Sequence, residues 1–123
     1  MTTTTTDQAL SRAMRIEGAI GAALVDYNSG LALGVIGGGP ELDLTAAAAG
    51  NTDVVRAKMR TMDMLGLKGE IDDILITLTA QYHLIRPLRS RTTLFFYVAL
   101  DRQRANLAMA RIALADVEKD LQV

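Results

Sequence analysis

The sequence predicts an α+β domain with a five-stranded, largely antiparallel sheet. Alternating apolar residues on either side of the turn-forming stretch DYNSG predict a β-hairpin near the start. Three further alternating stretches predict three more strands, and apolar residues spaced three and four apart predict helices before, between and after them. The expected order is helix, two strands, helix, three strands, helix, which fits one domain in a chain of 123 residues.

The chain opens with MTTTTT, a low-complexity stretch with no apolar side chain to pack after Met1. We expect residues 1–6 to form a disordered tail and residues 7–123 to form the single domain. A short helix is expected from about Asp7, a plausible N-cap, to Arg15.

The expected hairpin has strands over about 20–25 and 31–36, and Asn28 and Gly30 in its turn tolerate a positive φ. In the second strand, small residues such as Ala32 and Gly34 alternate with larger ones. The missing bulk predicts that a helix or another backbone lies close over that face.

A second helix is expected from about Glu41 to Leu65, with Gly66 ending it. Its apolar stripe comprises Leu44, Ala48, Val55, Met59 and Met62.

Three strands are expected next, over about 70–78, 81–88 and 92–100. The last of them is apolar on both faces, which predicts a central place in the sheet. The final helix is expected to begin at Asp101 as its cap and to bury one seam. That seam comprises Leu107, Ala110, Leu114, Val117 and Leu121.

Four glycines in ALGVIGGGPELD raise the question of a phosphate-binding loop. A Walker loop ends in Gly-Lys-Ser/Thr, whereas here Gly39 precedes Pro40, which has no backbone donor. Glu41 and Asp43 place carboxylates at the helix start, where they would repel a phosphate. The spacing also differs from G-x-G-x-x-G, so we interpret this stretch as a flexible connector.

Other candidate sites are also weak. Asp72 and Asp73, as neighbours in a strand, would point to opposite faces, and the preferred interpretation is a charged edge strand. His83 has no nucleophile motif beside it. The arginines of RPLRSR (Arg86, Arg89 and Arg91) form a local basic cluster that is either solvated or meets an acidic partner.

Composition excludes several classes of function. The chain has no Cys and one His, and its 13 basic and 14 acidic residues nearly cancel. Disulfides and Cys-based zinc sites are excluded, and no charge excess favours nucleic acid or membrane surfaces. With no signal-like start and no long apolar run, we expect a cytoplasmic protein without membrane insertion, and no catalytic, cofactor or metal site.

Four stretches resemble the roadblock (dynein light-chain) family, and the likeness extends over about residues 8–121. They are IEGAIGAALVDYNSGLALG, the Ala-rich LTAAAAGNTDVVRAKM with EIDDILITLTAQYHLIRPL, and the ending TLFFYVALDRQRANLAMARIALADVEKDL. The resemblance implies a bacterial, single-domain member with a profilin-like sandwich that forms homodimers, in which the strand at about 70–78 meets its symmetry mate and the middle helices lie side by side. The implied interface includes Ile71, Asp73, Leu75, Val54 and Met64.

Bacterial members of this family are implied to bind small Ras-like GTPases and to regulate them without supplying catalytic residues. Arg56 and Arg60, on the middle helix, are the expected partner contacts. Two alternatives stay open: a nucleotide-independent scaffold for signalling or motility complexes, and a small-ligand sensor with a pocket between sheet and helix.

Overall fold

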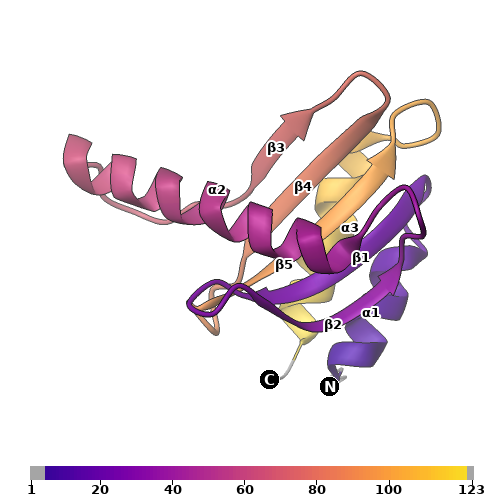
Figure 1. Cartoon of the computed structure of the whole chain (residues 1–123), viewed down its shortest axis with the longest axis horizontal. Coiled ribbons are helices and arrows are strands. Elements are labelled where there is room, and N and C mark those ends of the chain that lie inside the picture. Colours follow the sequence, from indigo (N-terminus) through magenta and orange to yellow (C-terminus); the bar gives the residue numbers. More distant parts are fainter. Residues whose placement is uncertain (1–4, 122–123) are drawn as a thin grey trace.

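The computed structural model describes residues 5–121 as a five-stranded sheet with helices on both faces (Figure 1). The order α-β-β-α-β-β-β-α and the antiparallel sheet confirm the fold class predicted from the sequence. The elements are α1 (Thr6–Met14), β1 (Ala19–Asp26), β2 (Leu31–Gly37), α2 (Leu44–Leu65), β3 (Ile74–Thr77), β4 (Gln81–Pro87), β5 (Leu94–Asp101) and α3 (Leu107–Asp120).

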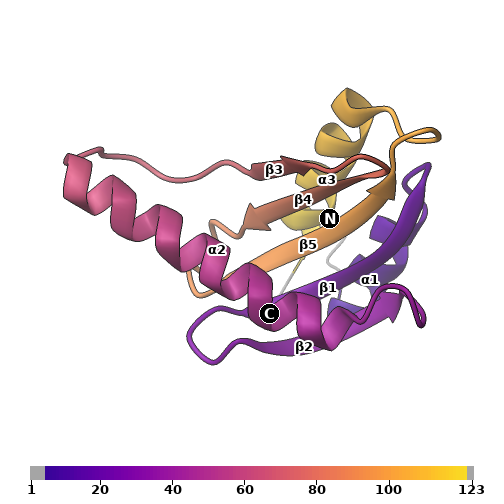
Figure 2. The same cartoon turned by 45° about the horizontal axis from the view of Figure 1, so that its top comes forward.

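The strands lie in the order β2-β1-β5-β4-β3, so β5 is central, as predicted from its two apolar faces. Residues Leu94 to Leu100 are all buried. Alternate side chains of β5 enter two separate cores. Phe96 and Val98 pack with α1 and α3, whereas Phe95 and Tyr97 pack with α2. Figure 2 shows α2 on one side of the sheet and α1 and α3 on the other.

The first helix begins earlier than predicted. Thr5, not Asp7, is the N-cap, and the Thr5 and Gln8 side chains each bond the other's backbone N–H in a capping box. Thr5 and Thr6 therefore belong to the folded structure, and the rest of the expected tail, residues 1–4, lies outside the described residues.

Gly34 confirms the expected close approach of a helix. A Cβ at Gly34 would lie 2.8 Å from Leu10 Cδ1 and 3.2 Å from Thr6 Cγ2, both on α1. Ala32 instead packs on the α2 side, because a register shift beside Leu24 breaks the alternation.

Helix α2 begins at Leu44 rather than near Glu41, because the Asp43 side chain accepts hydrogen bonds from the backbone N–H of Thr45 and Ala46. It ends at Gly66, which adopts φ 69° at the C-cap, as expected. Leu44, Ala48 and Val55 are buried as the stripe predicted. The second half of α2 and the segment after it extend beyond the sheet (Figure 1).

Two later boundaries also differ from the prediction. Strand β3 covers only Ile74–Thr77 of the expected 70–78, because the acidic residues before it bond to side chains elsewhere instead of pairing with β4. Asp101 ends β5, and Asn106 is the N-cap of α3, its side chain accepting from Met109 N–H at 3.1 Å.

We predict that Gly37→Ala lowers the free energy of unfolding by about 2–4 kcal/mol. Gly37 has φ 74°, and an added Cβ would lie 2.6 Å from the Ile20 carbonyl oxygen. Gly66→Ala is the matched control, because Gly66 has a similar φ of 69° but no atom within 4 Å of the added Cβ. Urea unfolding measures both variants, and equal losses would contradict the close approach at Gly37.

Candidate interaction surface

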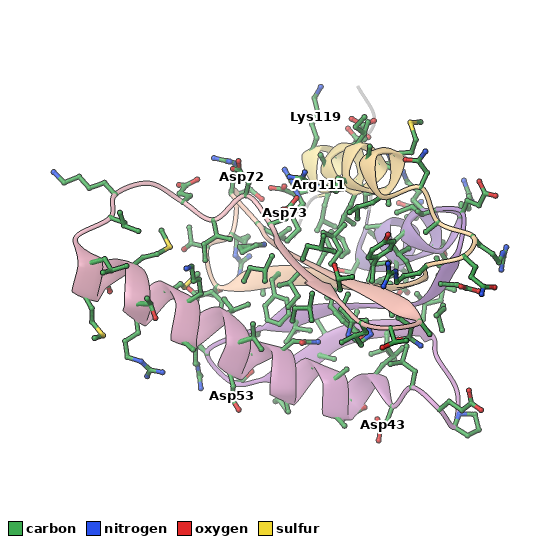
Figure 3. The ribbon with its side chains drawn as sticks, turned by 90° about the horizontal axis from the view of Figure 1, so that it is seen from above. Asp43, Asp53, Asp72, Asp73, Arg111 and Lys119 are labelled. Carbon is green, nitrogen blue, oxygen red and sulfur yellow. The ribbon has the colours of Figure 1, made fainter. Side chains whose placement is uncertain are left out.

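The acidic pair of the sequence analysis does not form a joint site. Asp73 accepts from Arg111 Nε on α3 at 2.8 Å, whereas Asp72 pairs with Arg89 (Figure 3). Neither aspartate lies in β3, although β3 is an edge strand as the preferred interpretation required. Within residues 5–121 no group of three or more His, Cys, Asp or Glu side chains is arranged to hold a metal.

The glycine connector leaves no phosphate site at the start of α2. The backbone donors of Thr45 and Ala46 are occupied by the Asp43 carboxylate, at 3.0 and 3.2 Å. A carboxylate in this position competes with any anion for the same donors and repels it. The connector itself is closed by a bridge between Gly39 and Leu42.

Helix α2 presents an outer face of small side chains away from the sheet. Asp53 lies on this face and points outward in Figure 3. The other members lie at helical spacing, one or two per turn, and in helical projection the exposed Arg56 and Arg60 fall among them toward the end of α2. The outer face of α2 comprises the exposed residues Thr45, Ala46, Ala49, Gly50, Asp53 and Ala57.

The end of α2 carries large apolar side chains that no other part of residues 5–121 covers. Met64 is 80% exposed, and Leu65 and Leu67 are also exposed. We call these three residues the α2 overhang. An apolar cluster of this kind on a surface indicates contact with another protein.

Ion pairs hold the segment between α2 and β3 against the body of the protein. Arg89, just after β4, donates to Glu70 Oε2 at 2.7 Å and also pairs with Asp72. Arg111 binds both carboxylate oxygens of Asp73, at 2.8 and 3.3 Å. These pairs fix the approach to β3 although the segment has no regular secondary structure.

A cavity of about 300 Å³ lies beneath this segment. Met59 and Met62 of α2 form one wall and Leu88, after β4, forms another. Tyr27 of the β1–β2 turn also contributes, so the cavity lies where the overhanging part of α2 leaves the sheet.

The five residues expected at the dimer interface fall into two groups. Met64 and Leu75 are exposed on α2 and on the outer strand β3. Val54 packs against the α2-side core, Ile71 lines the cavity, and the Asp73 side chain is only 11% exposed because Arg111 covers it.

Of the two expected partner contacts, Arg56 has a role within the chain. It donates to the Asn28 carbonyl oxygen and so ties α2 to the β1–β2 turn. Arg60 is exposed one turn further along α2.

The basic cluster of RPLRSR is also used inside the chain. Arg86 Nε donates to Glu118 Oε1 at 2.6 Å, and the buried Glu118 also accepts from Arg89 N–H at 2.9 Å. Glu118 thus joins α3 to β4, and the acidic partner of Arg86 and Arg89 is in the same chain.

A polar cluster between α2 and the sheet was not predicted. His83 Nε2 lies 2.7 Å from Gln81 Oε1, and His83 Nδ1 lies 3.3 Å from the Tyr97 hydroxyl. Burial raises the pKa of Tyr97 to about 12, against a smaller lowering by its hydrogen bond with Asn51 of α2. Burial also lowers the pKa of His83 from its usual value of 6.5. The sequence signal that could have indicated this cluster is the presence of polar residues on the inner faces of β4, β5 and α2.

None of the helices in the described part of the chain is both long enough and apolar enough to span a bilayer.

At the level of sequence, no protein-family model and no curated protein matches the chain. Solved structures do match it. A Roadblock/LC7 domain from Streptomyces avermitilis is 17% identical with a TM-score of 0.79, over 94% of this chain and 93% of that one. MglB of Myxococcus xanthus is 19% identical with a TM-score of 0.75, over 94% and 80%. The gliding protein MglB of Thermus thermophilus is 17% identical with a TM-score of 0.68, over 93% and 88%. At these identities the likeness shows the fold.

We predict that wild-type protein loses more stability than His83→Gln on acidification. The folded state binds a proton at His83 less readily than the unfolded chain does, because burial lowers the pKa of His83 below 6.5. The contribution of the neutral His83 side chain to the free energy of unfolding is therefore complete at pH values above 6.5. It decreases as the pH falls from 6.5 toward the lowered pKa. Urea unfolding at about pH 7.5 and about pH 5.5 measures the difference. Equal acid losses in both proteins would contradict it.

Proposed function

We propose that this chain, which has the Roadblock/LC7 fold, is a homodimeric, non-catalytic interaction module that binds a small Ras-like GTPase and regulates it. The observation that carries the proposal is the free surface formed by the outer face of α2, the α2 overhang and β3. The family resemblance of the sequence supports the identity of the partner.

The outer face of α2 supports a helix–helix contact between two copies. Helices approach most closely where small side chains meet, and axial separations of about 8–10 Å depend on those side chains. Ala46, Ala49 and Ala57 are exposed on this face and have little conformational entropy to lose on burial. A second α2 would then lie antiparallel beside the first.

The β3 edge supports a sheet that continues into the partner copy. Within residues 5–121, strand β3 pairs only with β4, so its other side is open, and Leu75 on β3 is 39% exposed. Two short strands related by a two-fold axis would join the sheets, while Met64 of each α2 overhang extends toward the other copy. The ion pairs of Arg89 and Arg111 present β3 in a fixed position for this contact.

Regulation of a GTPase by such a surface needs no catalytic side chain here. A protein that binds the switch segments better in one nucleotide state shifts the GTPase toward that state. Arg60, exposed on α2, is placed to contact an acidic partner surface. Arg56 contributes indirectly, by holding α2 to the β1–β2 turn.

The second candidate is a nucleotide-independent scaffold in a signalling or motility complex. It is favoured by the structural likeness to a protein described as a gliding protein. Both candidates use the same dimer and differ in whether the bound partner responds to GTP.

We predict that Ala57→Glu weakens the homodimer by ~100-fold or more, because two carboxylates would meet near the middle of paired α2 helices. Sedimentation velocity over a concentration series measures the dissociation constant. Ala108→Glu, an exposed alanine on α3, is the matched control. A dimer unchanged by Ala57→Glu would contradict the α2 contact.

The GTPase proposal is tested with purified small Ras-like GTPases from the same genome, loaded with GDP or with a non-hydrolysable GTP analogue. We expect one nucleotide state to bind at least ~10-fold more tightly, and Arg60→Glu to weaken that binding. Arg104→Glu, exposed in the turn before α3, is the control.

Equal binding to both nucleotide states would favour the scaffold. Absence of binding to every GTPase tested would reject the lead proposal.

A further inference from the structure

The two edges of the sheet differ in length and charge. Strand β2 has seven residues and β3 has four. Asp72 and Asp73 directly precede β3, whereas residues 27–40, which contain β2, include no charged side chain. Among the residues that the structure describes, β2 pairs only with β1, so its outer side is free.

Large apolar side chains are exposed along this free edge. Leu31 is 67% exposed, Leu33 is 55% exposed and Val35 is 48% exposed, and all three lie in β2. Natural edge strands are usually protected from pairing with another chain by charges, Pro or β-bulges. Strand β2 has no charge and no Pro, and the register shift beside Leu24 is its one bulge.

We infer that the free edge of β2 is a contact surface for a second copy of this chain, in which two β2 strands lie antiparallel about a two-fold axis near Leu33. This inference is independent of the proposed function, because it uses the opposite edge of the sheet from β3.

The absence of charge favours a second copy as the occupant. A two-fold contact places a segment against itself, so any charge near the axis meets the same charge. Residues 27–40 meet this requirement over their whole length. A charged partner would find no complementary group there.

The surrounding layers leave room for this contact. Helix α1 packs on both β1 and β2, with Leu10 and Thr6 against Gly34. With strands about 4.8 Å apart, the two α1 helices would lie about 10 Å apart across the new seam, which is a normal packing distance.

The register shift determines what holds the centre of this contact. Leu33 is the extra residue of β2 between Ala32, opposite Val25, and Gly34, opposite Leu24. Backbone pairing is interrupted at such a bulge, so contact between Leu33 and the partner's Leu33 carries the centre of the seam. Since β2 and β3 are opposite edges of the sheet, the β2 contact combined with dimerisation at β3 produces an open row of copies in which the two contacts alternate.

The first test is sedimentation velocity from about 1 to about 100 µM, with wild type, Leu33→Lys and the control Ala108→Lys. Both substituted side chains are exposed, so the fold is kept. We expect the average mass of wild type to exceed that of Leu33→Lys at the highest concentration, and Ala108→Lys to match wild type. A dimer as the largest species of Leu33→Lys indicates that the β3 contact also exists, and a monomer indicates that it does not. Equal masses for wild type and Leu33→Lys overturn the inference.

The second test uses the absence of cysteine from the chain. Leu33→Cys should form an intermolecular disulfide under mild oxidation at least ~10-fold faster than Ala108→Cys, because the inferred contact places the two residues at position 33 against each other at the two-fold axis, within disulfide range. Equal crosslinking rates for the two variants also overturn the inference.

Discussion

Burial of β5 on both faces is the constraint on which the rest of the structure depends. Phe95 and Tyr97 need cover on one side of the sheet, and Phe96 and Val98 need cover on the other. Helices α1 and α3 together cover one face, but α2 alone covers the opposite one. Because α2 is long and crosses that face toward the β3 edge, its second half leaves the sheet and carries apolar side chains into solvent (Figure 1). The surface proposed for dimer and partner contacts is thus a consequence of how the central strand is covered.

Ion pairs fix the segment that the two apolar cores do not hold. The segment between α2 and β3 has few apolar anchors, and Arg89 and Arg111 hold it through Glu70, Asp72 and Asp73. Exposed pairs of this kind contribute little individually, but several on one short segment restrict it more than one would. Glu118 has a different role, because it is buried with Arg86 and loss of either partner would leave an unpaired charge.

Patterns with a strong period were predictable from the sequence, and interactions between distant residues were not. The layers were predicted correctly from the two apolar faces of β5, the apolar stripe of α2 and the small residue Gly34. Each of these patterns reflects which neighbouring residues are buried. The ends of elements were less predictable, since Thr5, Asp43 and Asn106 compete as caps with nearby polar residues of the same type. The partners of Asp73, Arg86 and Arg56 lie 38, 32 and 28 residues away, so no local pattern indicates them. For the same reason residues expected at an interface, such as Asp73, prove to be engaged inside the chain.

The central claim is that α2 and β3 form a surface on which a second copy docks. Hydrogen–deuterium exchange of the full chain, compared between dilute and concentrated protein, tests it most directly. The account predicts that amides of β3 on the open side of the sheet, and the solvent-facing part of α2, exchange more slowly as concentration rises. Exchange in β3 and α2 that does not change while the protein associates would contradict the account, because association would then use another surface.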